Sequence, residues 1–201
     1  MSNVVDQVLS HLDDQRIAAI AAQLGTDPQQ ARTAIEQAIP LIVGKLGVNA
    51  SAPGGADVLH NVLTNDHAGV DIGGLLGGLL GGGGNNAGGI GGAILGHIFG
   101  NSQDAANHGL GQTSGLGSQN AAQLMAILAP IVMAVLGNMT QRQGLSPGGL
   151  GGVLAQTTQQ IQQQGSLGGG LLEAVLGHGG GSQIDVSHLL QGALGSLFSR
   201  R

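Results

Sequence analysis

The feature that most constrains this chain is the segment between Asp71 and Asp104, which contains no charged residue. Its first part, DIGGLLGGLLGGGGNNAGGIGGAILGHIFG at 71–100, is nearly half glycine. A membrane-spanning helix needs about 20 apolar residues in succession, and GGGGNN divides this segment into two shorter apolar pieces. We therefore expect a short apolar helix, a flexible joint at GGGGNNAGG (81–89) and a second helix at GAILGHIF (92–99).

Composition sets the kind of core that the chain can build. Of 201 residues, 40 are glycine, and Phe99 and Phe198 are the only aromatic residues. The core must therefore consist of Leu, Ile, Val and Ala packed closely around glycine. The charged fraction is 8%, against about 25% in a typical globular protein. A surface with so few charges is weakly repulsive, which favours self-association.

Charge and cysteine content exclude several classes of function. The net charge is −5, and no lysine or arginine lies between Lys45 and Arg142, whereas nucleic-acid binding needs clustered basic residues. The absence of cysteine rules out disulfides and thiol catalysis. The N-terminus has neither the basic region nor the continuous apolar core of a secretory signal. We therefore expect a cytoplasmic protein that does not bind nucleic acid.

The first third of the chain has the apolar periodicity of helices. Residues 13–24 place an apolar face at helical spacing, formed by Ile17, Ile20, Ala21 and Leu24. Gly25 is expected to end this helix, and Thr26 is expected to cap the next. That helix should run to about Lys45 and kink at Pro40, which cannot donate a backbone hydrogen bond.

Two pairs of similar segments suggest an internal duplication. ARTAIEQAIPLIVGKLG at 31–47 resembles AAQLMAILAPIVMAVLG at 121–137, with a proline at the same place in each. VDIGGLLGGLLG at 70–81 resembles IDVSHLLQGALG at 184–195. The alternating order of the pairs is what a duplication would leave, although a chain rich in Leu and Gly also matches itself by chance.

The duplication leads to a predicted division of the chain into three parts. The first is a helical half at 1–84 around Pro40, and the second is a related half at 85–176 around Pro130. The second half carries a Gln-rich insertion near 156–164. The third is a C-terminal helix at 177–201 on a glycine-rich tether.

Residues 185–201, DVSHLLQGALGSLFSRR, form the clearest amphipathic pattern in the chain. This helix either folds back onto its own core or docks into a groove of a neighbour or partner. The candidate interaction residues lie on its apolar face: Val186, Leu189, Leu190, Leu194, Leu197 and Phe198.

No catalytic or cofactor-binding pattern stands out. Seven histidines raise the question of a metal, and the densest local set contains His60 and His67. A metal site usually needs three or four convergent ligands, so histidines at helix ends or turns are the more ordinary interpretation. The glycine runs lack the strand that a dinucleotide-binding motif would follow. We assign no catalytic, cofactor-binding or metal-binding residue.

Four motifs in this order resemble one bacterial family: AIPLIVGKLG, NDHAGVDIGGLLGGLL, GGAILGHIFG and AQLMAILAPIVMAVLG. The chain is similar to domain-of-unknown-function family 937, which includes the YidB-like uncharacterised proteins, over roughly residues 12–155. The resemblance implies an all-α, multihelical fold with no established enzymatic activity. It offers no functional residues to carry over. The Gln-rich run and the amphipathic tail depart from the family pattern.

The sequence thus predicts an all-α, multihelical and glycine-rich protein, internally duplicated. We expect a non-enzymatic bacterial protein that assembles with itself or binds another protein, without a cofactor. One alternative is a membrane-peripheral protein that uses 71–100 or 185–201. The other is a metal protein or enzyme centred on His60 and His67.

Overall fold

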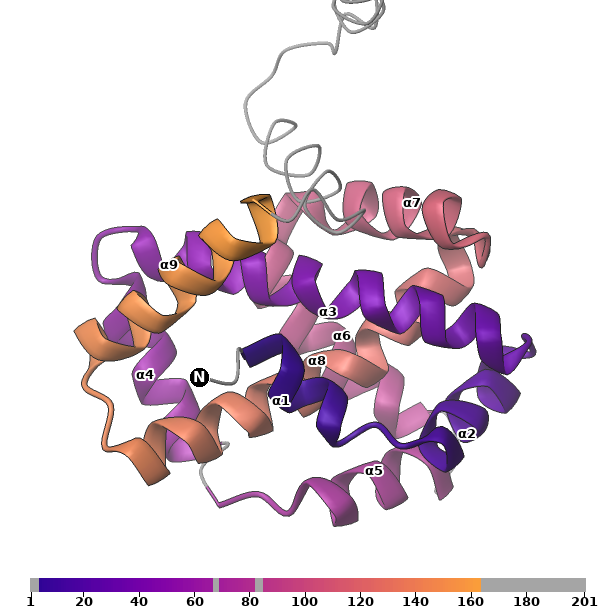
Figure 1. Ribbon diagram of the computed structural model, residues 1–201, viewed down its shortest axis with the longest axis horizontal. Coiled ribbons are helices and arrows are strands. Elements are labelled where there is room, and N and C mark those ends of the chain that lie inside the picture. Colours follow the sequence, from indigo (N-terminus) through magenta and orange to yellow (C-terminus); the bar gives the residue numbers. More distant parts are fainter. Residues whose placement is uncertain (1–3, 67–68, 82–84, 164–201) are drawn as a thin grey trace, which may run out of the picture.

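The computed structural model describes residues 4–66, 69–81 and 85–163, and these residues contain no strand. They form a helical assembly in which the long helices α3 and α8 cross the middle (Figure 1). The all-α prediction is confirmed. The elements are α1 (Val4–Ser10), α2 (Asp14–Leu24), α3 (Pro28–Ser51), α4 (Gly55–Asp66), α5 (Ile72–Gly81), α6 (Asn85–Phe99), the 3-10 helix η1 (Gly100–Ser102), α7 (Gln103–Ser114), α8 (Gly117–Gln143) and α9 (Pro147–Gln163).

The core is organised around α8. Every residue of this helix from Leu124 to Gly137 is buried, because α8 packs against α3, α4, α6 and α7. α3 is buried in the same way from Gln37 to Gly44. Both helices continue through a buried proline, Pro40 in α3 and Pro130 in α8. The burial of these apolar runs on all sides explains why each helix persists despite the missing backbone donor.

Glycines allow the closest helix contacts. A Cβ at Gly91 of α6 would lie 2.9 Å from the Ala126 Cα of α8 and closer still to the Ala126 carbonyl. A Cβ at Gly47 of α3 would lie 3.1 Å from the Leu154 carbonyl oxygen of α9. The α6–α8 and α3–α9 contacts are among the most extensive in the molecule. Small residues therefore sit where two helices approach to backbone distance.

The start and end of α3 differ from the sequence-based expectation. The N-cap is Asp27 and not Thr26, because the Asp27 carboxylate accepts hydrogen bonds from the backbone N–H groups of Gln29 (2.7 Å) and Gln30 (3.4 Å). The helix also extends to Ser51, beyond the expected end near Lys45, since packing against α4 and α9 supports its last turns. The end of α2 was predicted correctly: Gly25 adopts a left-handed conformation with φ 65°.

The glycine-rich segment is more helical than expected. The short apolar helix is present as α5, and the second helix is present as α6. α6, however, begins at Asn85, inside the expected joint at 81–89. The contact of Gly91 with α8 holds this part of the chain against the core, so only 82–84 of the expected joint falls outside the described residues.

Among the described residues, only α8 is long and apolar enough to cross a membrane. In this structure 83% of its most apolar window is buried inside the protein. This degree of burial is typical of the core helix of a globular protein.

The two predicted halves share one hydrophobic core, in which α3 packs directly on α8 and α9. The helix pairs α2–α3 and α7–α8 have common local features. A left-handed glycine follows the first helix, Gly25 or Gly115, and a proline lies inside the second. The duplication and the boundaries of the predicted domains stay predictions.

The Gln-rich run is part of a helix. Residues 156–163 belong to α9, which buries Leu150, Leu154, Thr157 and Ile161, while the glutamines at 159, 160, 162 and 163 are exposed. The run is thus the outer face of a helix that packs on α3. The tail helix predicted at 185–201 lies outside the described residues.

Replacement of Gly91 by alanine tests the close approach of α6 to α8. We expect Gly91→Ala to lower the free energy of unfolding by about 1–3 kcal/mol, because the added methyl group meets backbone that cannot move aside easily. Gly92→Ala is the matched control: its Cβ would meet nothing within 4 Å, so it should stabilise the helix by up to about 1 kcal/mol. Urea unfolding followed by circular dichroism measures both. Equal stabilities of the two variants would contradict the contact.

Candidate functional site

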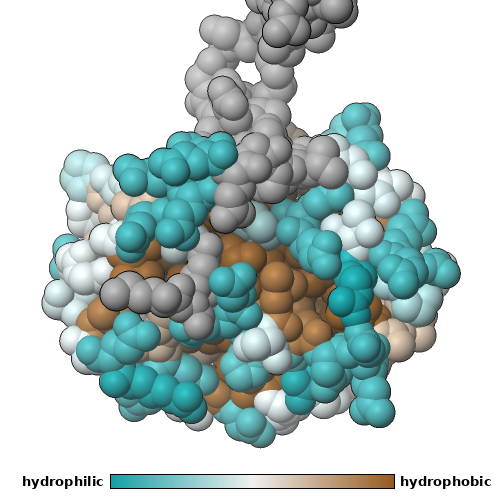
Figure 2. All heavy atoms as spheres, in the orientation of Figure 1, coloured by the Kyte–Doolittle hydropathy of each residue, from teal (hydrophilic) through white to brown (hydrophobic). Residues whose placement is uncertain are grey.

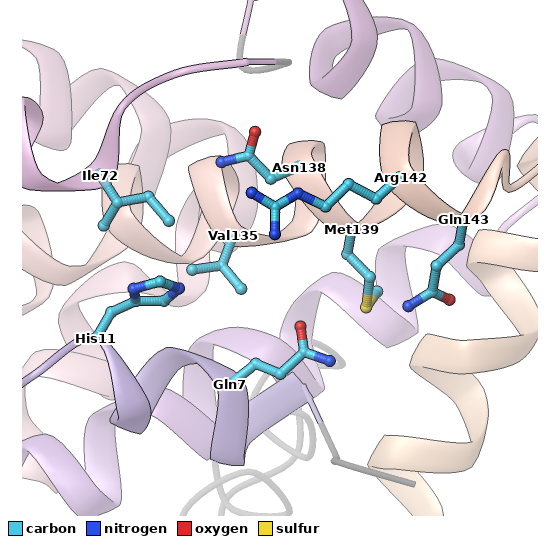
Figure 3. A pocket seen from close by; sticks show the side chains of 8 residues that line it. All are labelled: Gln7, His11, Ile72, Val135, Asn138, Met139, Arg142 and Gln143. Atoms are coloured by element: carbon cyan, nitrogen blue, oxygen red, sulfur yellow. The ribbon is translucent and has the colours of Figure 1, made fainter.

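A cleft lies where the end of α1, the start of α5 and the last turns of α8 meet. It consists of two adjacent hollows of about 260 and 490 Å³ that share the lining residues His11, Ile72, Asn138 and Arg142. In Figure 3 the labelled side chains converge on the smaller hollow from these three helices and from the loop after α1. We call this feature the Arg142 cleft.

Asn138 fixes one wall of the Arg142 cleft. Its Oδ1 accepts a hydrogen bond from the Gly69 N–H (3.1 Å), and its Nδ2 donates to the Val70 carbonyl (3.1 Å). The side-chain amide thus accepts one hydrogen bond from the α4–α5 loop and donates one to it, as the backbone of a neighbouring β-strand would. Gly69 has φ 73°, a conformation that glycine adopts without steric cost.

Asp71 fixes the second wall, because its carboxylate caps α5. The carboxylate oxygens accept hydrogen bonds from the backbone N–H groups of Gly73 (3.2 Å) and Gly74 (2.9 Å). A negative charge is favoured at this end of a helix, where free N–H groups and the helix dipole both attract it. The acidic group of the cleft therefore already has partners.

Arg16 and Arg142 bring positive charge to the cleft. Arg16 donates a hydrogen bond from Nη1 to the His11 carbonyl, and its Nε lies 3.9 Å from Asp13 Oδ2. Arg142 is exposed and forms neither an ion pair nor a hydrogen bond with the described residues. Since Arg142 and Asn138 are four residues apart on α8, they lie on the same face of the helix.

The deep side of the smaller hollow is apolar. It includes Ile72, Val135 and Met139, which are 8%, 3% and 5% exposed. Gln7 and Gln143 also line this hollow: Gln7 projects from α1 toward α8, and Gln143 lies beside Met139 on α8 (Figure 3). The cleft thus combines two guanidinium groups, one capped carboxylate and an apolar floor. This arrangement attracts an anionic group and can cover a short hydrocarbon chain.

His60 takes part in a structural contact. Its Nε2 lies 2.9 Å from the Leu145 carbonyl oxygen and ties α4 to the α8–α9 loop. Because a carbonyl only accepts hydrogen bonds, Nε2 carries the proton and is not free to bind a metal. His67 lies outside the described residues. Within the part of the chain that the structure describes, no group of three or more His, Cys, Asp or Glu residues is placed to hold a metal ion.

The residues of the cleft were not identified as a site from the sequence. The predicted interaction residues, Val186, Leu189, Leu190, Leu194, Leu197 and Phe198, lie outside the described residues, so that prediction stays open. The sequence contains one signal for the cleft. The apolar run of α8 ends at Gly137, and the more polar residues NMTQRQ at 138–143 follow it. Asn138 and Arg142 give this end of the helix a polar face.

Asn138→Asp tests the pairing with the α4–α5 loop. The variant keeps an acceptor for the Gly69 N–H but replaces the donor to Val70 by an oxygen that repels the carbonyl. We expect a loss of about 1–3 kcal/mol in unfolding free energy and faster hydrogen exchange at Gly69. Asn61→Asp, on the exposed surface of α4, adds the same charge as a control. Unchanged Gly69 exchange in Asn138→Asp would contradict the structural role of Asn138.

Comparison with protein families identifies the family of the chain. The model of the family described as bacterial protein of unknown function (DUF937) matches residues 6–139, well over half of the chain. The matched range includes most of α1, all of α2 to α7, and most of α8 with Asn138, and it ends before Arg142. Comparisons with curated proteins and with solved structures give no match. The resemblance noted in the sequence is thereby confirmed, and the chain belongs to the DUF937 family of bacterial proteins of unknown function.

Proposed function

We propose that this protein is a non-enzymatic, cytoplasmic interaction module that associates with further copies of itself, and that the Arg142 cleft is part of the contact. The observation that carries the proposal is Arg142, a guanidinium group without an ion-pair partner among the described residues, beside a hollow with an apolar floor. Arginine over partly apolar surface is typical of the central residues of protein interfaces.

The charge distribution supports a contact between copies. The chain has a net charge of −5, while two guanidinium groups and one carboxylate line the larger hollow of the cleft. Glu36, Asp57 and Asp104 are exposed and make no ion pair with the described residues. A positive cleft on an acidic molecule is therefore complementary to other parts of the same molecule.

The proposed contact joins two different groups, the cleft of one copy and a carboxylate of the next. In a head-to-tail arrangement such contacts build rings or open chains, according to the rotation that relates one copy to the next. In a symmetric dimer two such contacts form at once, because the cleft of each copy meets the carboxylate of the other. The proposal names the pairing of cleft and carboxylate, which both arrangements contain.

The rest of the surface has exposed apolar areas and few charged groups that would oppose association. Figure 2 shows apolar areas between the hydrophilic residues of the displayed face. Among the described residues, Val58 is a large hydrophobic side chain that is 65% exposed. With a charged fraction of only 8%, long-range repulsion between copies is small.

The alternatives receive less support from the described residues. The helix that is long enough to cross a membrane is mostly buried in the core, and 185–201 lies outside the described residues. A metal centre at His60 would have to use Nδ1, because Nε2 donates to the Leu145 carbonyl, and no group of three or more His, Cys, Asp or Glu among the described residues is placed to complete it. Flotation with liposomes and elemental analysis test these two alternatives directly.

Arg142→Gln is the variant that tests the proposal. We expect the wild-type protein to show a concentration-dependent increase in mass by sedimentation, weakened by salt because the attraction is between exposed charges. Arg142→Gln should weaken this association about tenfold, as expected for the loss of one charge-assisted contact. Arg32→Gln is the matched control, since it removes the same charge from an exposed pair with Asp14. A monomer at every concentration, or equal association of both variants, would refute the proposal.

A further inference from the structure

We infer that the group recognised in the Arg142 cleft is a carboxylate on a short aliphatic arm, as in the side chain of Glu or Asp. This inference rests on the proposed function, because it names the chemistry of the partner at the same surface. Its basis is the arrangement of charge, free donors and apolar floor inside the cleft.

The two guanidinium groups differ in how firmly they are held. Arg16 is half-buried, with 34% of its side chain exposed, and is oriented by the His11 carbonyl and Asp13. Its Nη2 lies toward the start of α5, 3.9 Å from the Cβ position of Gly73. Arg142 is exposed and carries five donors, none of which bonds to a described residue. One fixed and one adaptable guanidinium therefore line the larger hollow.

Arg142 supplies the available positive charge of the cleft, because Arg16 already lies against Asp13. Asp71 is the acidic residue in the lining, and both of its oxygens accept backbone hydrogen bonds. Asn138 uses its amide on the α4–α5 loop. Arg142 and the amides of Gln7, Gln141 and Gln143 therefore offer N–H donors to an incoming ligand.

The apolar floor distinguishes a carboxylate on an alkyl arm from other anions. The floor of Ile72, Val135 and Met139 lines the smaller hollow, of about 260 Å³, and favours methylene groups over a second charged group. The two guanidinium groups line the adjoining larger hollow, of about 490 Å³. Because Arg142 lines both hollows, a carboxylate bound to it can place its methylene groups over the floor.

Nuclear magnetic resonance of the full ¹⁵N-labelled chain tests the inference, with sodium butyrate, a singly charged carboxylate on an alkyl arm, as a probe for the side chain of a glutamate. We expect saturable shifts at the Gly69 and Gly73 amides and at the Asn138 side chain. Arg142→Gln should weaken this binding about tenfold, whereas Arg32→Gln should leave it unchanged. Sodium chloride at the same ionic strength controls for screening, and inorganic phosphate is the second probe.

Three results would overturn the inference: no saturable shift with butyrate, equal binding by Arg142→Gln and wild type, or phosphate binding as tight as that of butyrate. The last result would indicate a general anion site. The sedimentation experiment separates these failures from failure of the proposed function. Association that depends on Arg142 without butyrate binding would refute the inference alone. Butyrate binding by a strictly monomeric protein would refute the proposed function and leave a carboxylate site.

Discussion

The close approach of helix backbones is the constraint on which this structure depends. The chain has almost no aromatic side chains, so its helices cannot fill wide gaps and must lie near one another to exclude water. Glycine makes this possible at Gly91 against α8, at Gly47 against α9 and at Gly111 against the start of α8. The helical propensity lost at each glycine is about 1 kcal/mol, and the contacts of the neighbouring Leu, Ile and Ala side chains offset it.

α8 connects this core to the candidate site. From Leu124 to Gly137 the helix is buried on all sides, and beyond this run Asn138 and Arg142 line the cleft. A rigid core helix therefore positions both the residue that holds the α4–α5 loop and the guanidinium at the opening. Sites supported in this way are held more firmly than sites on loops alone.

The proposed function follows from the contrast between the cleft and the remainder of the molecule. In the proposed contact, the cleft of one copy meets a carboxylate of another. The attraction proposed is between exposed charges, so its strength should depend on salt and concentration. An interaction of this kind suits an assembly that forms and dissociates readily.

The sequence by itself determined the helical class, the apolar face of α2 and the left-handed glycine that ends it, and the family. These features depend on local periodicity, turn chemistry and motif order. Only the tertiary structure decided how far α3 and α6 extend, because contacts with other helices stabilise their ends. It also decided the cleft: His11, Asp71 and Arg142 are distant in sequence, and no local pattern indicates that the packing of α1, α5 and α8 brings them to one surface.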